Sequence, residues 1–378
     1  MERVNFFMDY KKNLVQQYNQ CAAYKLLCDN QGFNPSINLK SENDMDEVPY
    51  FTTTLFKKSH GLFKDLLRVP ADKLDKWTVS SSTSGDPSIV GRRTKDIIKI
   101  KEFIEREKSL KSLNDYDCVF YPEPEVMKKY KSQVILGKST ESYIGNMLDI
   151  FNFSENTIFL IKPDKEDLTI DMDSFKAFLE DHNNMDHNLS IRGSTILLFD
   201  SVNKLKDNMK PVKLGKNAII HTGGGGWDGK KGNLSMGSAL RRQDFVEIVS
   251  EFLGVPKENF VDSYSFTENS FPITGHYSKE YKDYLFHIPT WGRVMIRDIK
   301  TLKPLKNEGD KGFIQMLNAY GTSAFAGASI LVDDIGEIVS MEECPECGSK
   351  LMTIRILGRV KGSEAKGCGA TLNVKEGI

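Results

Sequence analysis

Long apolar runs, an excess of charge of one sign and a dense set of cysteines are all missing from this sequence. No stretch reaches the roughly 18 consecutive apolar residues that a membrane-spanning helix needs. Lysine and arginine number 51 against 52 aspartate and glutamate, and the resulting net charge of −1 draws the chain neither to nucleic acid nor to a membrane surface. The first residues carry charge where a secretory signal needs an apolar stretch. We therefore expect a cytoplasmic protein with no membrane span and no nucleic-acid partner.

Six cysteines in 378 residues do not make a disulfide scaffold, so we expect thiols or metal ligands in a reducing compartment. Cys344 and Cys347 form a Cys-Pro-x-Cys-Gly turn, and two thiolates at this spacing can hold one tetrahedral metal ion. Only half of a zinc ribbon is present, so further ligands would have to come from elsewhere in the chain. A pair of reduced thiols in a tight turn remains the alternative.

The length of the chain suits one large α/β domain or two ordinary ones. Short apolar runs that read as buried strands alternate with helical stretches, which favours parallel α/β units. Beyond about residue 284, short β-rich pieces broken by glycine and aspartate indicate a β subdomain. The predicted strands are 118–121, 157–161, 195–199, 218–221, 294–296, 329–332 and 338–341, and the predicted helices are 9–27, 96–110 with Asp96 as its cap, 175–179 and 244–253, with a loop over 40–50.

Four short segments have the residue types of a nucleotide site. A loop from Ser80 to Ser88 offers hydroxyls and backbone N–H groups to phosphate oxygens, although it lacks the lysine of a Walker loop. Glycines 223–226 directly follow a predicted strand, where a flat ligand can approach the backbone. The segment from Tyr264 to Glu268 combines an aromatic ring, a hydroxyl and a carboxylate that can bind Mg²⁺. Each of these, like the basic turn at Gly358-Arg359, also fits an ordinary solvated turn or strand.

The order of these segments is more informative than any one of them. A Ser/Thr/Gly loop, a Gly-Gly segment, Tyr-x-x-Thr-Glu, an aspartate before Gly336 and then Gly-Arg make a series that resembles the adenylate-forming superfamily. The sequence is most similar to the LuxE-type acyl-protein synthetases within it. The loop Thr83-Ser84-Gly85-Asp86 lacks the lysine of longer CoA ligases, and the chain ends about twenty residues after Gly-Arg, with a cysteine in that tail.

The resemblance implies the large α/β domain of that superfamily over residues 1–357, with a β subdomain from about 285 and a tail over 358–378. It implies ATP and Mg²⁺ as cofactors, with Tyr264 stacked on adenine, Thr267 near the α-phosphate, Glu268 as the magnesium ligand and Cys368 as the acylated thiol. The other ATP-binding residues that it implies are Ser81, Ser82, Thr83, Ser84 and Gly85 in the phosphate loop, Gly223, Gly224 and Gly225 against adenine, and Asp334 and Arg359 at the ribose.

The sequence also departs from the superfamily pattern. Ser265 replaces the usual glycine after the stacking tyrosine, and Val-Asp-Asp replaces Thr-Gly-Asp, which leaves Asp333 as an alternative ribose ligand. We expect the C-terminal domain that carries a catalytic lysine in that superfamily to be missing or reduced to the tail. Mg²⁺, together with Lys361 or Lys366, would then have to neutralise the α-phosphate.

The implied reaction activates a carboxylic acid, expected to be a long-chain fatty acid, as acyl-AMP, and transfers the acyl group to a thiol for a partner acyl reductase or acyltransferase. One alternative is an acyl- or aryl-CoA ligase of the phenylacetate type, which dependence of AMP release on coenzyme A would reveal. The other is a catalytically silent acyl- or nucleotide-binding subunit, which would not convert ATP to AMP. The phenylacetate–CoA ligases, which this region also resembles, further imply His276 and His287 as partners of Cys344 and Cys347 in a structural zinc site.

Overall fold

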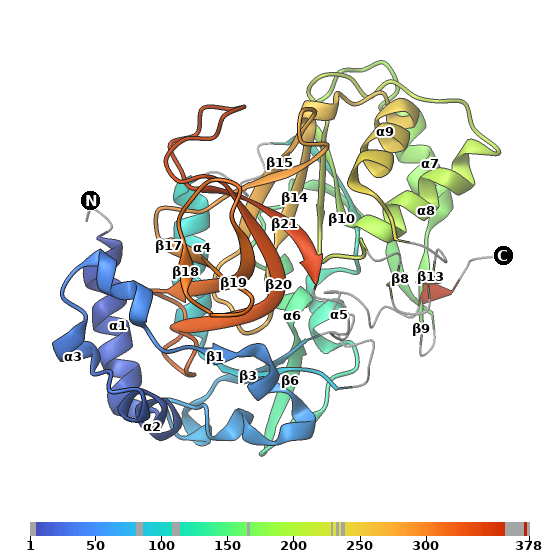
Figure 1. Ribbon diagram of the computed structural model, residues 1–378. Coiled ribbons are helices and arrows are strands. Elements are labelled where there is room, and N and C mark those ends of the chain that lie inside the picture. Colours follow the sequence, from blue (N-terminus) through green and yellow to red (C-terminus); the bar gives the residue numbers. More distant parts are fainter. Residues whose placement is uncertain are drawn as a thin grey trace.

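A computed structural model describes residues 5–80, 86–107, 114–164, 167–227, 230–231, 234–235, 239–359 and 374–375. Its centre is a 13-stranded sheet with the order β18-β17-β19-β20-β21-β16-β15-β14-β11-β10-β4-β7, and β1 (Phe51–Thr52) pairs with β20 (Figure 1). The sheet has a parallel half and an antiparallel half that meet at β14. It therefore confirms the predicted mixed α/β class.

The parallel half holds the alternating strands and helices that the sequence predicts. Its strands are β4 (Tyr116–Phe120), β7 (Asn156–Phe159), β10 (Leu189–Ser194), β11 (Ile219–Gly223) and β14 (Phe260–Tyr264). Figure 1 shows the helices α7 (Met172–Asp181), α8 (Thr195–Lys206) and α9 (Arg242–Leu253) on one side of the molecule beside these strands. Parallel strands align their carboxyl ends, so the residues that follow β11 and β14 lie at one edge.

The strand predicted over 195–199 is wrong, because these residues open α8. The side chain of Ser194 accepts a hydrogen bond from the Leu197 backbone N–H at 3.4 Å and caps the helix. The helix is buried from Thr195 to Phe199, so it lacks the polar face that would have revealed its period. A short apolar run of this kind does not distinguish a buried strand from a buried helix.

The antiparallel half continues the same sheet. It contains β15 (Ile273–Ser278), β16 (Asp283–His287), β17 (Gly292–Arg297), β18 (Pro304–Leu305), β19 (Lys311–Asn318), β20 (Ser329–Ser340) and β21 (Thr353–Arg359). The two short strands predicted over 329–332 and 338–341 are the ends of the single strand β20, and β19 was not predicted. The acidic pair and glycine that suggested a break lie inside β20, where register shifts relative to β19 and β21 accommodate them.

The N-terminal part forms two helices where one was predicted. Helix α1 (Phe6–Gln20) is followed directly by α2 (Ala22–Asn30), and Cys21 between them has an extended backbone that interrupts the helix. Helix α3 (Pro35–Asn38) comes next. Short 3-10 turns cover 42–47, part of the predicted loop, and recur between residues 53 and 73. Asp96 does not cap α4 (Thr94–Glu107) but lies within it, where its carboxylate accepts hydrogen bonds from the backbone and hydroxyl of Ser323.

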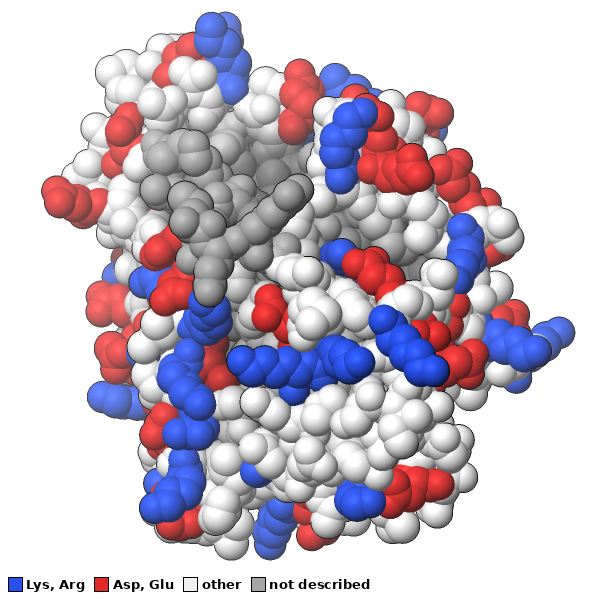
Figure 2. Space-filling view, turned by 90° about the vertical axis from the view of Figure 1, so that its left-hand side faces the viewer, with Lys and Arg blue, Asp and Glu red and all other residues white. Residues whose placement is uncertain are grey.

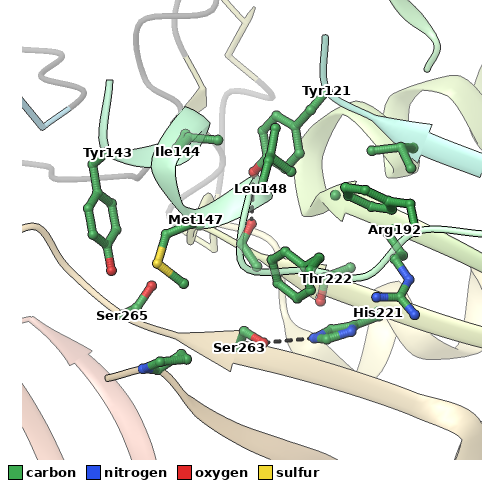
Figure 3. A pocket seen from close by; sticks show the side chains of 17 residues that line it. Tyr121, Tyr143, Ile144, Met147, Leu148, Arg192, His221, Thr222, Ser263 and Ser265 are labelled. Carbon is green, nitrogen blue, oxygen red and sulfur yellow. Dashed lines mark hydrogen bonds between the residues drawn. The ribbon is translucent and has the colours of Figure 1, made fainter. Parts of the chain in front are cut away.

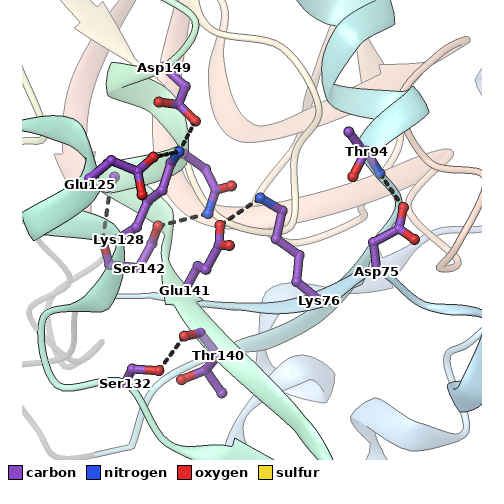
Figure 4. Close-up of polar contacts among 12 residues, drawn as sticks. Asp75, Lys76, Thr94, Glu125, Lys128, Ser132, Thr140, Glu141, Ser142 and Asp149 are labelled. Carbon is purple, nitrogen blue, oxygen red and sulfur yellow. Dashed lines mark hydrogen bonds and ion pairs between the residues drawn. The ribbon is translucent and has the colours of Figure 1, made fainter.

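A four-stranded sheet, in the order β3-β2-β6-β5, positions the elements that flank the loop over 81–85. Its strands are β2 (Lys76–Val79), β3 (Ile89–Arg92), β5 (Val134–Ile135) and β6 (Lys138–Ser142), and the adjoining helices are α5 (Pro124–Lys129) and α6 (Tyr143–Leu148). Figure 4 shows Lys76 paired with Glu141 at 2.5 Å, and Lys128 paired with Glu125 and Asp149. Lys128 thereby ties α5 to the end of α6.

Two small sheets lie outside this core. Strand β22 (Val374–Lys375) runs parallel to β9 (Asp167–Ile170), which also pairs with β8 (Ile161–Asp164), and β12 (Lys230–Lys231) pairs with β13 (Leu234–Ser235). Cys368 and residues 361–373 lie outside the described ranges, between Arg359 in one sheet and Val374 in another. None of the described helices is long and apolar enough to cross a membrane. Figure 2 shows basic and acidic side chains mixed over one face, as the balanced composition predicts.

Candidate active site

Glycines continue the carboxyl end of β11 and leave it without side chains. Gly223 pairs with Ser263 of β14, and Gly224, Gly225 and Gly226 follow with positive φ angles of 82°, 73° and 94°. A Cβ atom at Gly226 would come within 2.8 Å of Ile196 Cγ1, so a larger residue there would be both strained and crowded. The segment therefore offers a bare backbone surface at the sheet edge, where the sequence predicted one.

Tyr264 and Asp334 are 70 residues apart in sequence but touch in the structure. Tyr264 ends β14, and its hydroxyl donates a hydrogen bond to Asp334 Oδ2 at 2.7 Å. Asp334 lies in β20 and pairs with Arg359 of β21, so the structure also brings the backbone of Arg359 to this place. Neighbouring residues of a strand point to opposite faces, so Asp334 rather than Asp333 faces the tyrosine. We call Gly223, Gly224, Gly225, Tyr264 and Asp334 the glycine–tyrosine wall.

The segment after Tyr264 is buried, and an arginine donates hydrogen bonds to its backbone. Thr267 and Glu268 are only 1% and 3% exposed. Arg92 Nη2 donates hydrogen bonds to the carbonyl oxygens of Thr267 at 2.6 Å and Asn269 at 2.9 Å. Burial lowers the pKa of Arg92, and the charges of Tyr143, Asp96 and Glu268 oppose that shift. The carboxylate of Glu268 thus lies within the field of a buried cation.

The predicted phosphate loop itself, Ser81–Gly85, lies outside the described residues, but its two ends are well defined. The Ser88 backbone N–H donates to Ser80 Oγ at 2.8 Å, and the Ser80 N–H donates to the Ser88 carbonyl at 3.0 Å. Lys57 Nζ donates to the carbonyl of Asp86 at 2.5 Å, and Ser59 holds the carboxylate of Asp86. Ser80 and Ser88, which flank these residues, are therefore held together at the end of the antiparallel pair β2–β3.

An apolar pocket of about 70 Å³ adjoins the glycine–tyrosine wall (Figure 3). It is bounded by α6 and by the carboxyl ends of the parallel strands. Ser263 and Ser265, the residues directly before and after Tyr264, also line it. Several lining side chains are rings, so we call it the aromatic pocket. The rings come from Tyr121, Tyr143, Phe151, Phe153 and His221.

One end of the aromatic pocket carries buried polar groups. Arg192 in β10 is 7% exposed, and its Nε lies 2.6 Å from Ser190 Oγ and 3.3 Å from Asp117 Oδ1. His221 Nε2 lies 2.7 Å from Ser263 Oγ. Burial, with a smaller contribution from the charge of Arg192, lowers the pKa of His221 to about 3, so this imidazole is neutral at physiological pH.

A buried aspartate accepts hydrogen bonds from the residues that flank the glycine segment. Asp262 accepts hydrogen bonds from the Thr222 hydroxyl at 2.9 Å and from the Trp227 indole N–H at 3.3 Å. Burial raises the pKa of Asp262 to about 6, although the nearby charge of Arg242 lowers it. These contacts link both ends of the glycine segment to β14.

The structure also gathers the four predicted metal ligands. One ligand atom each from His276, His287, Cys344 and Cys347 lies within 4.8 Å of the other three. His276 Nδ1 is 3.1 Å from His287 Nε2, which is 3.4 Å from Cys347 Sγ, and the other nitrogen of His287 contacts Thr353 Oγ1 at 3.1 Å. Two thiolates and two imidazoles suit tetrahedral Zn²⁺, and a second hydrogen bond that orients a ligand histidine is common in such sites.

Motif reasoning did not find the polar end of the aromatic pocket. Arg192 stands in the buried run Leu-Ser-Ile-Arg-Gly-Ser, and a charged residue inside an apolar strand is itself a signal that was available. Asp117 is a similar case in β4, since it is completely buried. Phe151 and Phe153 carry no comparable mark, because nothing in their spacing distinguishes pocket rings from core rings.

The fold is that of the adenylate-forming ligases. A structure of 2-hydroxyisobutyryl-CoA ligase with 2-HIB-AMP and CoA has the same fold with a TM-score of 0.64, at 16% identity over 95% of this chain and 68% of the ligase. An open conformation gives 0.63, at 15% identity over 94% and 69% of the two chains, and a postadenylation state gives 0.61, at 14% identity over 94% and 67%. No curated protein sequence matches the chain.

The chain belongs to the LuxE family of acyl-protein synthetases, whose family model matches residues 4–376. The match covers nearly the whole chain, and it therefore includes the glycine–tyrosine wall, the aromatic pocket and the residues around Cys368. Family and fold together make the protein a ligase that activates an acid through an adenylate.

Proposed function

We propose that this protein uses ATP to activate a carboxylic acid as acyl-AMP and then passes the acyl group to a cysteine thiol. The observation that supports this most strongly is the common position of two different surfaces. The glycine–tyrosine wall and the aromatic pocket meet at the carboxyl end of β14, where Ser263 and Ser265 line the pocket and Tyr264 between them contacts Asp334. A nucleotide on the wall and an acid in the pocket would place their reacting groups beside Thr267.

In the first step, a carboxylate oxygen of the acid attacks the α-phosphorus of ATP. The new bond joins that oxygen to phosphorus, and the bond to the bridging oxygen breaks and releases pyrophosphate. A carboxylate needs no base at neutral pH, so the chain's residues act by orientation and by stabilising charge. Tyr264 holds the base, Asp334 and Arg359 hold the ribose, and Thr267 donates to the α-phosphate. Glu268 would hold Mg²⁺, which supplies positive charge to the phosphates when bound.

In the second step, a thiolate attacks the acyl carbon, a thioester forms and AMP leaves. Cys368 is the proposed acceptor, and Lys361 and Lys366 favour its thiolate. A thioester keeps enough activation for onward transfer, which suits delivery to a partner acyl reductase or acyltransferase. A ligase that uses coenzyme A as the thiol, and a silent binding subunit, are the competing functions.

The first substrate to test is a long-chain fatty acid, because the family is one of acyl-protein synthetases. The apolar walls of the aromatic pocket support an acid with an apolar body. The pocket is open on one side, so a long chain could extend out of it.

Incubation with ATP, Mg²⁺ and labelled acid tests both steps. We expect acid-dependent release of AMP and pyrophosphate, and label that stays on the denatured protein until neutral hydroxylamine removes it. Cys368→Ser should lose the label and keep pyrophosphate exchange, because activation precedes transfer. AMP release that requires coenzyme A would favour the CoA ligase. Hydroxylamine-sensitive label on Cys368→Ser would mean that another cysteine is the acceptor. A protein that releases no AMP with any acid would be the silent subunit.

We further propose that His276, His287, Cys344 and Cys347 hold a structural Zn²⁺. His276 lies on β15 and His287 on β16, and both cysteines lie in the turn between β20 and β21, so the ion would join that turn to β15 and β16. Four protein ligands leave no position for a reactive water molecule. Metal analysis should give about one zinc per chain, and Cys344→Ser should lower both zinc content and melting temperature. Cys118→Ser is the control, since this buried thiol lies in β4, away from the four ligands. Zinc-free protein with an unchanged melting temperature would refute the site.

A further inference from the structure

Arg92 connects segments of the chain that carry different parts of the site. It ends β3, the strand that follows the predicted phosphate loop, and it is only 7% exposed. Its Nη1 donates a hydrogen bond to the carbonyl oxygen of Gly321 at 3.1 Å, and its Nη2 donates to the carbonyl oxygens of Thr267 and Asn269. The guanidinium thus joins the strand after the loop to the segment that contains Glu268.

The two acceptors of Nη2 are the residues directly before and after Glu268. One nitrogen holds the Thr267 carbonyl at 2.6 Å and the Asn269 carbonyl at 2.9 Å, so the backbone is fixed on both sides of the carboxylate. Glu268 is itself only 3% exposed, and close packing leaves a buried side chain few alternative positions once its backbone is fixed. The position of the proposed magnesium ligand therefore depends on the guanidinium of Arg92.

Further contacts fix the guanidinium and the strand that carries it. The ring of Phe325 lies against the guanidinium, with its centroid 4.6 Å from Arg92 Cζ. Asp96, in the first turn of α4, accepts hydrogen bonds from the backbone and hydroxyl of Ser323. The junction of β3 and α4 is thereby attached to the segment 321–325 at several points. A planar guanidinium can bind carbonyls of two segments at once, whereas the single ammonium group of a lysine cannot reproduce that geometry.

We propose that Arg92 is the positioning residue of the magnesium site, and that by holding the backbone on both sides of Glu268 it fixes the carboxylate that would hold Mg²⁺ at the phosphates of ATP. The inference rests on the proposed function, since that function makes Glu268 the magnesium ligand. Arg92 touches neither substrate in this scheme and acts only through the residues from Thr267 to Asn269. Groups that orient a metal ligand from outside the coordination sphere typically contribute roughly 10- to 100-fold to metal affinity or activity.

Binding of Mn²⁺ tests the proposal without any turnover. Mn²⁺ serves as a paramagnetic substitute for Mg²⁺, and α,β-methylene-ATP provides the phosphates but cannot release pyrophosphate. The spin resonance of free and bound Mn²⁺ gives the dissociation constant of the metal–nucleotide complex. Arg92→Lys keeps the charge and removes the planar pair of nitrogens, so we expect this constant to rise by roughly 10- to 100-fold. The affinity for AMP without metal should stay near the wild-type value, because the glycine–tyrosine wall is unchanged.

Arg68→Lys is the matched control. Arg68 is also buried, at 5% exposure, and its Nη1 donates to the carbonyl oxygen of Thr322 at 2.8 Å, within the segment 321–325. Its other hydrogen bonds go to Asn13 and Gln20 in α1. The change therefore disturbs a buried arginine and the same segment without reaching the magnesium ligand. Its affinity for the Mn²⁺ complex should equal that of the wild type even if its melting temperature falls.

Phe325→Leu provides a milder change of the same kind, which also covers the case in which Arg92→Lys does not fold. Loss of the ring against the guanidinium should raise the dissociation constant by roughly two- to fivefold. Wild-type affinity in a folded Arg92→Lys protein, judged by its melting temperature, overturns the inference. An equal rise in Arg68→Lys also overturns it, as does wild-type affinity in Phe325→Leu if Arg92→Lys does not fold.

These outcomes are distinct from failure of the proposed function. Each of them leaves adenylation standing as long as the wild type shows acid-dependent pyrophosphate exchange. Glu268→Gln protein that binds the Mn²⁺ complex as tightly as the wild type would refute the magnesium role of Glu268, and the inference would fall with it. A wild type that exchanges pyrophosphate without any divalent metal would have the same consequence.

Discussion

The glycine–tyrosine wall and the aromatic pocket share the edge formed by β11 and β14, yet they are built from different kinds of residue. The wall uses glycines, one aromatic ring and carboxylates in short motifs that keep a fixed order along the chain. The pocket shares Gly223 and Gly224 with the wall, but its rings come from separate segments between Val119 and Pro272 and belong to no common motif. In the proposed reaction the wall would bind ATP, which is common to every acid, whereas the pocket would bind the acid itself.

This difference has a testable consequence. Changes in the wall and in the residues behind it should alter the use of ATP or the stability of the sheet, and changes in the pocket should alter the use of the acid. The following variants examine this separation in order of decreasing effect.

Glu268→Gln should cause the largest loss. The amide keeps the shape of the side chain but removes the charge that would hold Mg²⁺, so pyrophosphate exchange should fall by about 100-fold or more with every acid. Glu258→Gln is the control, because that carboxylate is 63% exposed in a pair with Lys279, and its exchange rate should not change. Wild-type exchange by Glu268→Gln would remove the assigned role.

Asp262→Asn should change the pH dependence of stability. The pKa of Asp262 is raised to about 6 in the folded protein, so its contribution to stability is fully present below its unfolded pKa, near 4, and is lost as the pH rises through 6. The wild type should therefore lose about 2 kcal/mol relative to the variant between pH 4 and pH 7. Urea unfolding of both proteins at several pH values measures this, and a difference that does not vary with pH would contradict it.

Phe151→Ala should affect the acid and spare the nucleotide. Removal of a half-buried ring from the pocket wall should lower kcat/KM for the acid by about tenfold, since a buried phenyl side chain contributes roughly 1.5–3 kcal/mol. The KM for ATP should stay near the wild-type value. Equal effects on both substrates would mean that the wall and the pocket are not separate.

Tyr264→Phe should give the smallest effect. It should weaken the use of ATP and leave the use of the acid unchanged, the reverse of Phe151→Ala. The ring remains for stacking, but the hydrogen bond to Asp334 is lost, and one such bond is worth about 0.5–1.5 kcal/mol, or roughly two- to tenfold in the KM for ATP. The ratio of kcat/KM values between two acids should not change. Initial rates at varied ATP and fixed acid provide the measurement, and a changed acid preference would contradict the separation.

The same contrast explains how much the sequence revealed. The α/β class, most strands of the parallel half and the residues of the wall were predictable, because glycine, tyrosine and acidic residues recur there in a fixed order. The meeting of two histidines with two cysteines was expected from resemblance rather than from local pattern, whereas the hydrogen bond between Tyr264 and Asp334 was not predicted. Propensity could not show that β20 is one strand, because only its neighbours stabilise the acidic residues in its middle.

Two errors have the same physical origin. The run over 195–199 and the rings of Phe151 and Phe153 are apolar stretches whose surroundings, rather than their own sequence, determine what they become. Arg192 was overlooked for a different reason: it pairs with Asp117 across β4 and β10, and pairings between strands are not visible along the chain.

The adenylate itself is the most direct test of the central claim. Cys368→Ser, incubated with ATP, Mg²⁺ and an acid but without any added thiol, completes the first step and lacks the proposed acceptor for the second. Mass spectrometry of the protein-bound small molecules should detect acyl-AMP at up to one per chain, together with free pyrophosphate, and neither product should form with Glu268→Gln. Formation of ADP with an acyl phosphate, or no nucleotide product with any acid while ATP still binds, would contradict the account.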